Sequence, residues 1–328
     1  MKHRYIMCSR KVEGKLFIPE PGETLYLKVP SGKDPLPEHA IEAKSWFNEV
    51  QKASVWGRDS KDPTYARGDI LFFVHGYNND QKTEVMLRHD QLNMDLEEVG
   101  FKGVLVSYDW PSDNKAIAYL EDRHDAKKTA MQLVTDAIAI LAERQQPGCH
   151  INIHLLAHSM GALVVREAFD DADDCKLQNN SWMISQLIFL AGDVSSDSMS
   201  AFNPTSESIY RHCIRLTNYS NLYDSVLKLS SGKRVGLAPR VGRVGLPENA
   251  PVDKAVNVDC SEYYNLMMND KEIYERDQKV IIGYESHSWF IGNKKFTRDL
   301  FETLIGDYDR SVIAARRKTS NPLMYTLV

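Results

Sequence analysis

The chain has 328 residues, of which 43% are hydrophobic and 26% charged, proportions that are ordinary for a globular protein. A formal net charge of -5 and a pI near 6.1 argue against a protein that binds nucleic acid. No apolar run reaches the roughly 18 residues that a membrane-spanning helix needs, and the first residues lack the apolar core of a secretory signal.

The cysteines are few and widely spaced along the chain: Cys8, Cys149, Cys175, Cys213 and Cys260. Their odd number and the lack of a C-x-x-C pair favour free thiols over a disulfide framework or a zinc site. We therefore expect a cytoplasmic protein without a bound metal or other cofactor.

Strand-like and helical segments alternate along the chain. The predicted strands, short and mostly apolar, are residues 5–10, 24–29, 69–76, 102–111, 151–158, 186–192, 213–220 and 255–261. The predicted helices are residues 38–54, 80–100 with Asp80 as its cap, 116–145, 162–174 and 294–306. Short apolar strands separated by helices predict an α/β protein with a mostly parallel sheet covered by helices on both faces.

No linker rich in proline, glycine or serine divides the chain. We expect one domain over residues 1–328, with edge strands and a helix in residues 1–67 and the catalytic core in residues 68–310. Residues 231–251 are predicted to form a loop insertion. Residues 261–284, rich in Tyr, Leu and Met, are expected to form either a lid or an extra packed helix.

The loop at 231–251 is cationic. Its side chains Lys233, Arg234, Arg240 and Arg243 suggest steering of an anionic substrate toward the carboxyl edge of the sheet. The alternative is a solvated loop with no such role.

Ser159 lies between a predicted strand and a predicted helix, in the segment LLAHSMGALV. A nucleophilic serine is often presented on such a sharp turn, which needs small residues two places before and after it. Ala157 and Gly161 meet that need. The alternative is an ordinary polar residue in a chance pattern. His158, inside the motif, is expected to face away from the reacting side and either to pack or to support the site indirectly, rather than to be the base.

A serine hydroxyl becomes a nucleophile only when a base removes its proton. Beyond Ser159 the chain has only two histidines, His212 and His287. His212 precedes the strand at 213–220, at its buried entrance. His287 lies in a loop-like stretch before the last helix, where it can reach over the carboxyl edge of the sheet. We predict that His287 is the base, and the alternative is a surface-loop histidine.

An acid is needed to orient this base and fix its tautomer. Asp224 follows the strand at 213–220 and is favoured, because the acid usually follows the penultimate strand in this order. Asp193, after the preceding strand, is the rival. Either aspartate could instead be a turn or cap residue.

Two backbone N–H groups are needed to bind the oxyanion. Met160, directly after the serine, and Tyr77, after the tight turn His75-Gly76, are the predicted donors. Each such donor typically contributes about 3–4 kcal/mol of transition-state stabilisation. Trp110, near the end of the strand at 102–111, is either a pocket residue or a structural aromatic beside a proline.

Six motifs occur in an order that resembles the α/β-hydrolase superfamily. They are FFVHGYNND, VSYDWPSD, LLAHSMGALVVREAF, LIFLAGDVSSDSM, YSNLYDSVLKLS and SHSWF, between about residues 68 and 305. More narrowly, the chain is similar to the hydrolase family known as domain of unknown function nine hundred. The resemblance implies the α/β-hydrolase fold, with Ser159, Asp224 and His287 as the catalytic triad.

These residues predict a serine hydrolase that cleaves a carboxylic ester or related acyl bond of a small molecule through an acyl-enzyme. It would be esterase-like or lipase-like and would use no metal. Two alternatives stay open. One is an acyltransferase with the same triad, and the other is a hydrolase fold that serves only as a binding module.

Overall fold

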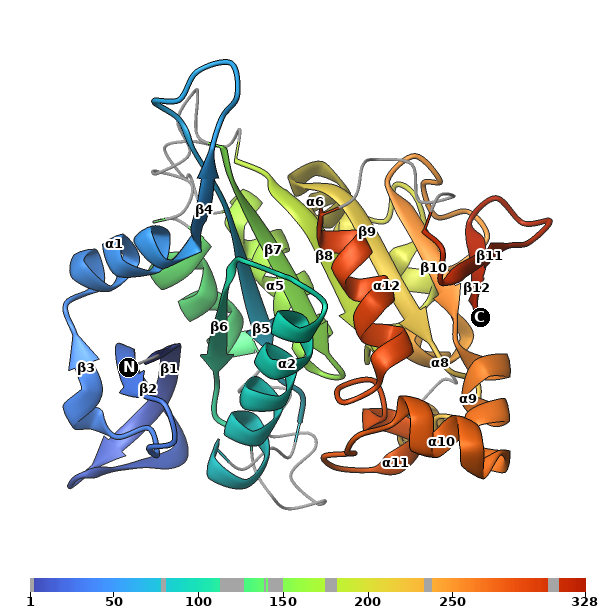
Figure 1. The fold of residues 1–328 in the computed structure, drawn as a ribbon, viewed down its shortest axis with the longest axis horizontal. Helices are drawn as coiled ribbons and strands as arrows, with labels where there is room; N and C mark the ends of the chain where they lie inside the picture. The colour runs from blue at the N-terminus through green and yellow to red at the C-terminus, as the bar shows by residue number, and fades with distance from the viewer. Residues whose placement is uncertain are drawn as a thin grey trace.

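A twelve-stranded sheet runs through the computed structural model of the protein (Figure 1). The structure describes residues 3–77, 81–112, 127–138, 140, 150–174, 182–232, 238–305 and 313–328. The strands are β1 (His3–Glu13), β2 (Leu16–Pro30), β3 (Ala40–Ile41), β4 (Val55–Arg58), β5 (Ala66–Val74), β6 (Val104–Asp109), β7 (His150–His158), β8 (Ile184–Leu190), β9 (Cys213–Ser220), β10 (Ala255–Asp259), β11 (Arg316–Lys318) and β12 (Met324–Leu327).

The described helices alternate with these strands along the sequence. They are α1 (Ala43–Ser54), α2 (Met86–Glu98), α5 (Gly161–Asp174), α6 (Pro204–His212), α7 (Ser225–Gly232), α8 (Val241–Val244), α9 (Ser261–Asn269), α10 (Lys271–Asp277), α11 (Glu285–Ser288) and α12 (Lys294–Ile305). Short 3₁₀ or π segments are η1 (Pro37–His39), η2 (Gln81–Val85), η3 (Val134–Ile138) and η4 (Asp197–Met199).

The central strands are parallel. The sheet order is β11-β12-β10-β9-β8-β7-β5-β6-β1-β2-β3, with β4 paired to β5. All pairs from β1–β6 through β10–β12 are parallel, and only β1–β2, β2–β3, β4–β5 and β11–β12 are antiparallel. The carboxyl ends of the parallel strands therefore meet at one edge, which α11 borders (Figure 1).

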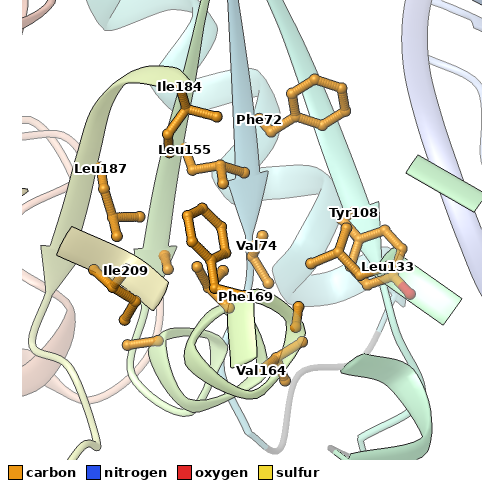
Figure 2. Close-up of a cluster of buried hydrophobic side chains, with 14 of the residues drawn as sticks. Phe72, Val74, Tyr108, Leu133, Leu155, Val164, Phe169, Ile184, Leu187 and Ile209 are labelled. Carbon is orange, nitrogen blue, oxygen red and sulfur yellow. The ribbon is translucent and has the colours of Figure 1, made fainter. Parts of the chain in front are cut away.

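Both faces of the sheet are buried, because successive residues of a strand point to opposite sides. On one face, Phe72 and Val74 of β5 pack with Phe169 of α5, as Figure 2 shows. On the other face, Leu71 and Phe73 belong to a cluster that includes the apolar side of α12. Figure 1 shows α2 and α12 together on this second face. The predicted α/β-hydrolase fold, with a mostly parallel sheet and helices on both faces, is confirmed.

Each predicted strand is present, and four short strands were not predicted: β3, β4, β11 and β12. The helix predicted at 80–100 is η2 followed by α2, and Asp80 lies outside the described residues. Of the helix predicted at 116–145, the structure describes residues 127–138 and 140.

The predicted loop at 231–251 and the segment 261–284, predicted as a lid or an extra helix, both pack against the protein where they are described. Residues 238–251, expected to be part of a loop, contain the one-turn helix α8, and Arg240 has no exposed surface. Residues 261–284 contain α9 and α10, and Tyr263, Tyr264 and Met267 of α9 are buried in the same cluster as α12.

Cys8, Cys213 and Cys260 are buried free thiols, whereas Cys149 and Cys175 lie outside the described residues. Within the described ranges, no helix combines the length and the apolar character needed to cross a bilayer.

Candidate active site

Ser159 occupies a sharp turn between β7 and α5. Its φ of 56° lies in the left-handed region, which is uncommon for a residue with a side chain and typical of a strained functional turn. The Ser159 amide donates to the carbonyl of Leu190 at 2.9 Å. A Cβ on Gly161 would collide with the carbonyl oxygens of Val74 and His75, the second at 2.6 Å. The turn therefore needs glycine at this position, as the motif predicts.

The loop after β5 comes close to the serine. A Cβ on Gly76 would lie 2.7 Å from the Cβ of Ser159, so only glycine allows this approach. Tyr77, next in the loop, is half-buried against the core. The amide of Met160 donates to no backbone carbonyl among the described residues, so it is available as a hydrogen-bond donor.

Asp224 and His287 form a buried pair. His287 Nδ1 lies 2.6 Å from Asp224 Oδ2, and both side chains are almost inaccessible to solvent. The other carboxylate oxygen of Asp224 accepts the Leu227 amide at 2.9 Å. An Nδ1–H that donates to the carboxylate leaves the lone pair on Nε2, which is the tautomer that a base needs.

The segment that carries His287 is anchored on two sides. Asn221, in the loop that also carries Asp224, donates to the Ser286 carbonyl at 3.0 Å. From the other side, the buried guanidinium of Arg88 donates to the Ile282 carbonyl at 2.9 Å. Sequence reasoning missed both anchors: Asn221 lies within the motif YSNLYDSVLKLS but was not singled out, and Arg88 lies in no motif.

His158 is turned toward His287, so the expectation that it faces away is wrong, whereas the expected supporting role fits its contacts. Its Nε2 lies 3.1 Å from the His287 carbonyl oxygen, and the two ring centroids are 4.8 Å apart. Burial, and then the proximity of His287, holds the pKa of His158 well below its ordinary value. A neutral His158 donates through Nε2 to this carbonyl. This bond holds the His287 backbone next to the serine turn.

No hydrogen bond joins the Ser159 hydroxyl to His287 among the described residues. Such bonds are often long in a protein without substrate and tighten in the Michaelis complex.

Asp193 has a different partner. Its carboxylate lies 2.9 Å from Nε of the fully buried Arg240 and accepts the Ser230 hydroxyl at 3.0 Å. Its amide donates to the Ser159 carbonyl at 2.9 Å. Asp193 thus stabilises the turn at Ser159 through its amide, whereas the Asp224 carboxylate contacts His287. Because Arg240 is buried in this pair, the expectation that it belongs to an exposed cationic loop is wrong.

His75 begins the loop that follows β5, and its ring is buried. His75 Nε2 lies 3.1 Å from the Trp110 backbone amide and 3.2 Å from Asp109 Oδ1, and Nδ1 lies 2.8 Å from the Gly76 carbonyl oxygen. Complete burial lowers the pKa of His75, which agrees with a neutral ring. Trp110 stacks on this ring and has no exposed surface. Of the two expectations for Trp110, the structural one fits this position.

A buried ion pair lies next to His75. The Asp109 carboxylate is 2.8 Å from Nε of Arg10, on the neighbouring strand β1. It also accepts a hydrogen bond from the side-chain Nε2 of Gln81 at 2.6 Å. Burial alone would raise the pKa of Asp109, but the charge of Arg10 and the contact with His75 hold it well below its usual range. Among the described residues, no cluster of three or more His, Cys, Asp or Glu has the arrangement of a metal site.

Comparison with known proteins identifies the family. The model of the alpha/beta hydrolases of unknown function, DUF900, matches residues 58–268, which is more than half of the chain. A comparison with curated proteins finds no match.

Two of the solved structures that the chain is similar to are the following. A proposed cell surface hydrolase from Lactobacillus plantarum WCFS1 has 14% sequence identity and a TM-score of 0.34, over 64% of this chain and 96% of its own. A lipase-esterase related protein from Clostridium acetobutylicum ATCC 824 has 16% identity and a TM-score of 0.30, over 76% of this chain and 97% of its own. With a serine turn, a buried acid–histidine pair and a matching family model, the chain belongs to the DUF900 family of α/β hydrolases.

Proposed function

We propose that the protein is a serine hydrolase that cleaves a carboxylic ester or a related acyl bond of a small molecule. Ser159 is the nucleophile, His287 the base and Asp224 the orienting acid. The observation that carries the proposal is the buried bond between His287 Nδ1 and Asp224 Oδ2, on a histidine whose ring contacts the residue next to Ser159.

The reaction then follows from the chemistry of these groups. His287 Nε2 accepts the proton of the Ser159 hydroxyl while Oγ attacks the acyl carbon. The amides of Met160 and Tyr77 donate to the oxyanion of the tetrahedral intermediate. The imidazolium returns its proton to the leaving alcohol, which leaves an acyl-enzyme. Water, activated by the same base, releases the acid and restores the serine.

A fluorophosphonate probe tests the proposal. We expect the wild-type protein to be labelled and to hydrolyse at least one p-nitrophenyl ester in a series from acetate to palmitate. Ser159→Ala should lose both activities, because the attacking oxygen is gone. Ser45→Ala is the matched control, since Ser45 is exposed on α1, and it should behave as the wild type. A folded wild-type protein that reacts with neither probe nor ester would favour a binding module instead.

A further inference from the structure

His287 lies on a helix that is too short to fix its own position. α11 has the four residues Glu285–Ser288, and the amides of His287 and Ser288 both donate to the Tyr284 carbonyl, at 3.1 and 2.8 Å. The last four carbonyls of a helix have no partner inside it, so every carbonyl of this single turn needs a partner elsewhere. Isolated helical turns are also unstable in water. Bonds from other segments must therefore hold the base in place.

Two carbonyls of α11 are bonded to the segments that carry the other members of the proposed triad. The Ser286 carbonyl accepts Asn221 Nδ2 at 3.0 Å, from the loop of the proposed acid. The His287 carbonyl oxygen lies 3.1 Å from Nε2 of His158, the residue directly before the proposed nucleophile. One bond therefore ties the base to the acid loop, and the other ties it to the serine turn.

The hydrogen of the His158 ring is on the nitrogen that faces the base. Burial first, and then the nearby His287, lowers the pKa of His158, so the ring is neutral and has one N–H. His158 Nδ1 has no hydrogen-bond partner among the described residues. A hydrogen on Nδ1 would leave the Nε2 lone pair facing the lone pairs of the His287 carbonyl. The favoured tautomer therefore donates through Nε2.

The His158 ring also lies close to the loop after β5. A Cβ on Gly76 would be 3.2 Å from His158 Nδ1 and 2.7 Å from the Cβ of Ser159. The His158 and His287 ring centroids are 4.8 Å apart, and the His158 side chain is 3% exposed. Because the ring is buried among these groups, it has little room to move with the base.

We propose that His158 is a positioning residue that sets the distance between the Ser159 hydroxyl and His287 Nε2. The inference rests on the proposed function, since it assumes that these two groups exchange a proton. A misplacement of about 1 Å in a reacting group can lower a rate by about 100-fold. Loss of the His158 donor should therefore lower kcat and leave the binding of the substrate largely unchanged.

Substitutions of His158 test this role. We expect His158→Leu to lower kcat for ester hydrolysis by about 100-fold, with KM changed by less than about threefold. His158→Gln should keep kcat within about tenfold of the wild type, because its Nε2 can donate to the same carbonyl. His154→Leu is the control, since it removes another buried histidine of β7, one that lies 3.1 Å from Asp69. Its folded fraction, measured by circular dichroism, should keep the wild-type kcat.

A second pair of variants covers the case in which His158→Leu does not fold. His158→Asn has a shorter side chain, whose amide reaches the place of Nδ1 rather than that of Nε2. It should therefore lose kcat as His158→Leu does, whereas His158→Gln should not. Equal kcat in His158→Asn and His158→Gln would overturn the inference.

Crystal structures provide a readout besides activity. We expect the His287 carbonyl to move by about 1 Å in His158→Leu or His158→Asn and to stay in place in His158→Gln. An unmoved His287 with wild-type kcat in the variants without the donor would overturn the inference and leave the proposed function intact. A wild-type protein that reacts with neither ester nor fluorophosphonate would instead refute the proposed function, and the inference with it.

Discussion

Two buried aspartates follow neighbouring strands, and they have different partners. Asp224 contacts His287, and Asp193 contacts Arg240. Asp224→Asn should lower kcat for ester hydrolysis by about 10⁴-fold, because the amide favours the wrong histidine tautomer. The protein should remain folded.

Asp193→Asn is the matched control. It leaves a buried arginine without its carboxylate, so we expect a loss of stability of about 3–5 kcal/mol. The fraction that stays folded should keep its reaction with the fluorophosphonate probe. If the two variants lost kcat equally while both stayed folded, the assignment of Asp224 would be wrong.

For single residues, the sequence predicts the serine turn. It does not predict all of the side chains that hold neighbouring segments in place. Ser159 and Gly161 could be predicted because the turn imposes residue sizes at fixed spacing. The direction of His158 could not, because it depends on where a segment more than a hundred residues later returns to the sheet. The same holds for Arg88, whose contact with Ile282 has no local signal.

The turn after β5 is linked to strand β1 through Asp109, at the end of the intervening strand β6. Arg10 of β1 neutralises Asp109, which lies against His75 in that turn. Arg10→Met should destabilise the protein by about 3–5 kcal/mol at neutral pH, because it leaves a buried carboxylate without a cation. Urea unfolding followed by circular dichroism measures this loss.

The pH dependence provides a check on the same pair. Because the folded pKa of Asp109 is lowered, its contribution is complete above the unfolded value of about 3.9 and is lost as the pH falls toward the folded value. Asp109→Asn should therefore flatten the fall of stability below about pH 4. If stability below about pH 4 fell as steeply in Asp109→Asn as in the wild type, Asp109 would not be the group that causes the fall.

The last strands of the sheet depend on Arg316 of β11. Its guanidinium is buried 2.6 Å from the Asp299 carboxylate of α12. The adjacent Arg317 forms an exposed pair with Glu262 at 2.8 Å. We expect Arg316→Met to lower the free energy of unfolding by about 3–5 kcal/mol and Arg317→Met to change it little. Similar effects of the two variants in denaturant titrations would disprove the difference in role.

Sequence patterns predict long apolar strands and miss short ones. β5, β7 and β8 are buried over most of their length, and each carries an apolar run toward its carboxyl end: ILFFV, LLA and LIFL. β11 is only Arg316–Lys318, and no hydrophobic alternation marks it. It forms because Arg316 has a buried partner, which is a tertiary cause. The helix α8 was missed for a similar reason, since Arg240 at its start is held by Asp193.

At the scale of the whole molecule, one hydrogen-bonded sheet connects the first strands to the last. We propose that the chain unfolds as one domain. Arg10→Met and Arg316→Met, at opposite ends of the sheet, should then each lower the protection of amides in both β1 and β12. Hydrogen exchange measures both strands in one experiment. Loss of protection confined to the end that carries the substitution would indicate separate units.

The central claim is that Ser159 is the nucleophile of a triad with His287 and Asp224, beside an oxyanion site made by Met160 and Tyr77. A crystal structure of the fluorophosphonate-treated protein tests it most directly. We predict phosphorus bonded to Ser159 Oγ, His287 Nε2 within hydrogen-bond reach of the adduct, and the phosphoryl oxygen about 3 Å from both amides. Phosphorus on another residue, or an oxygen directed away from both amides, would contradict the account.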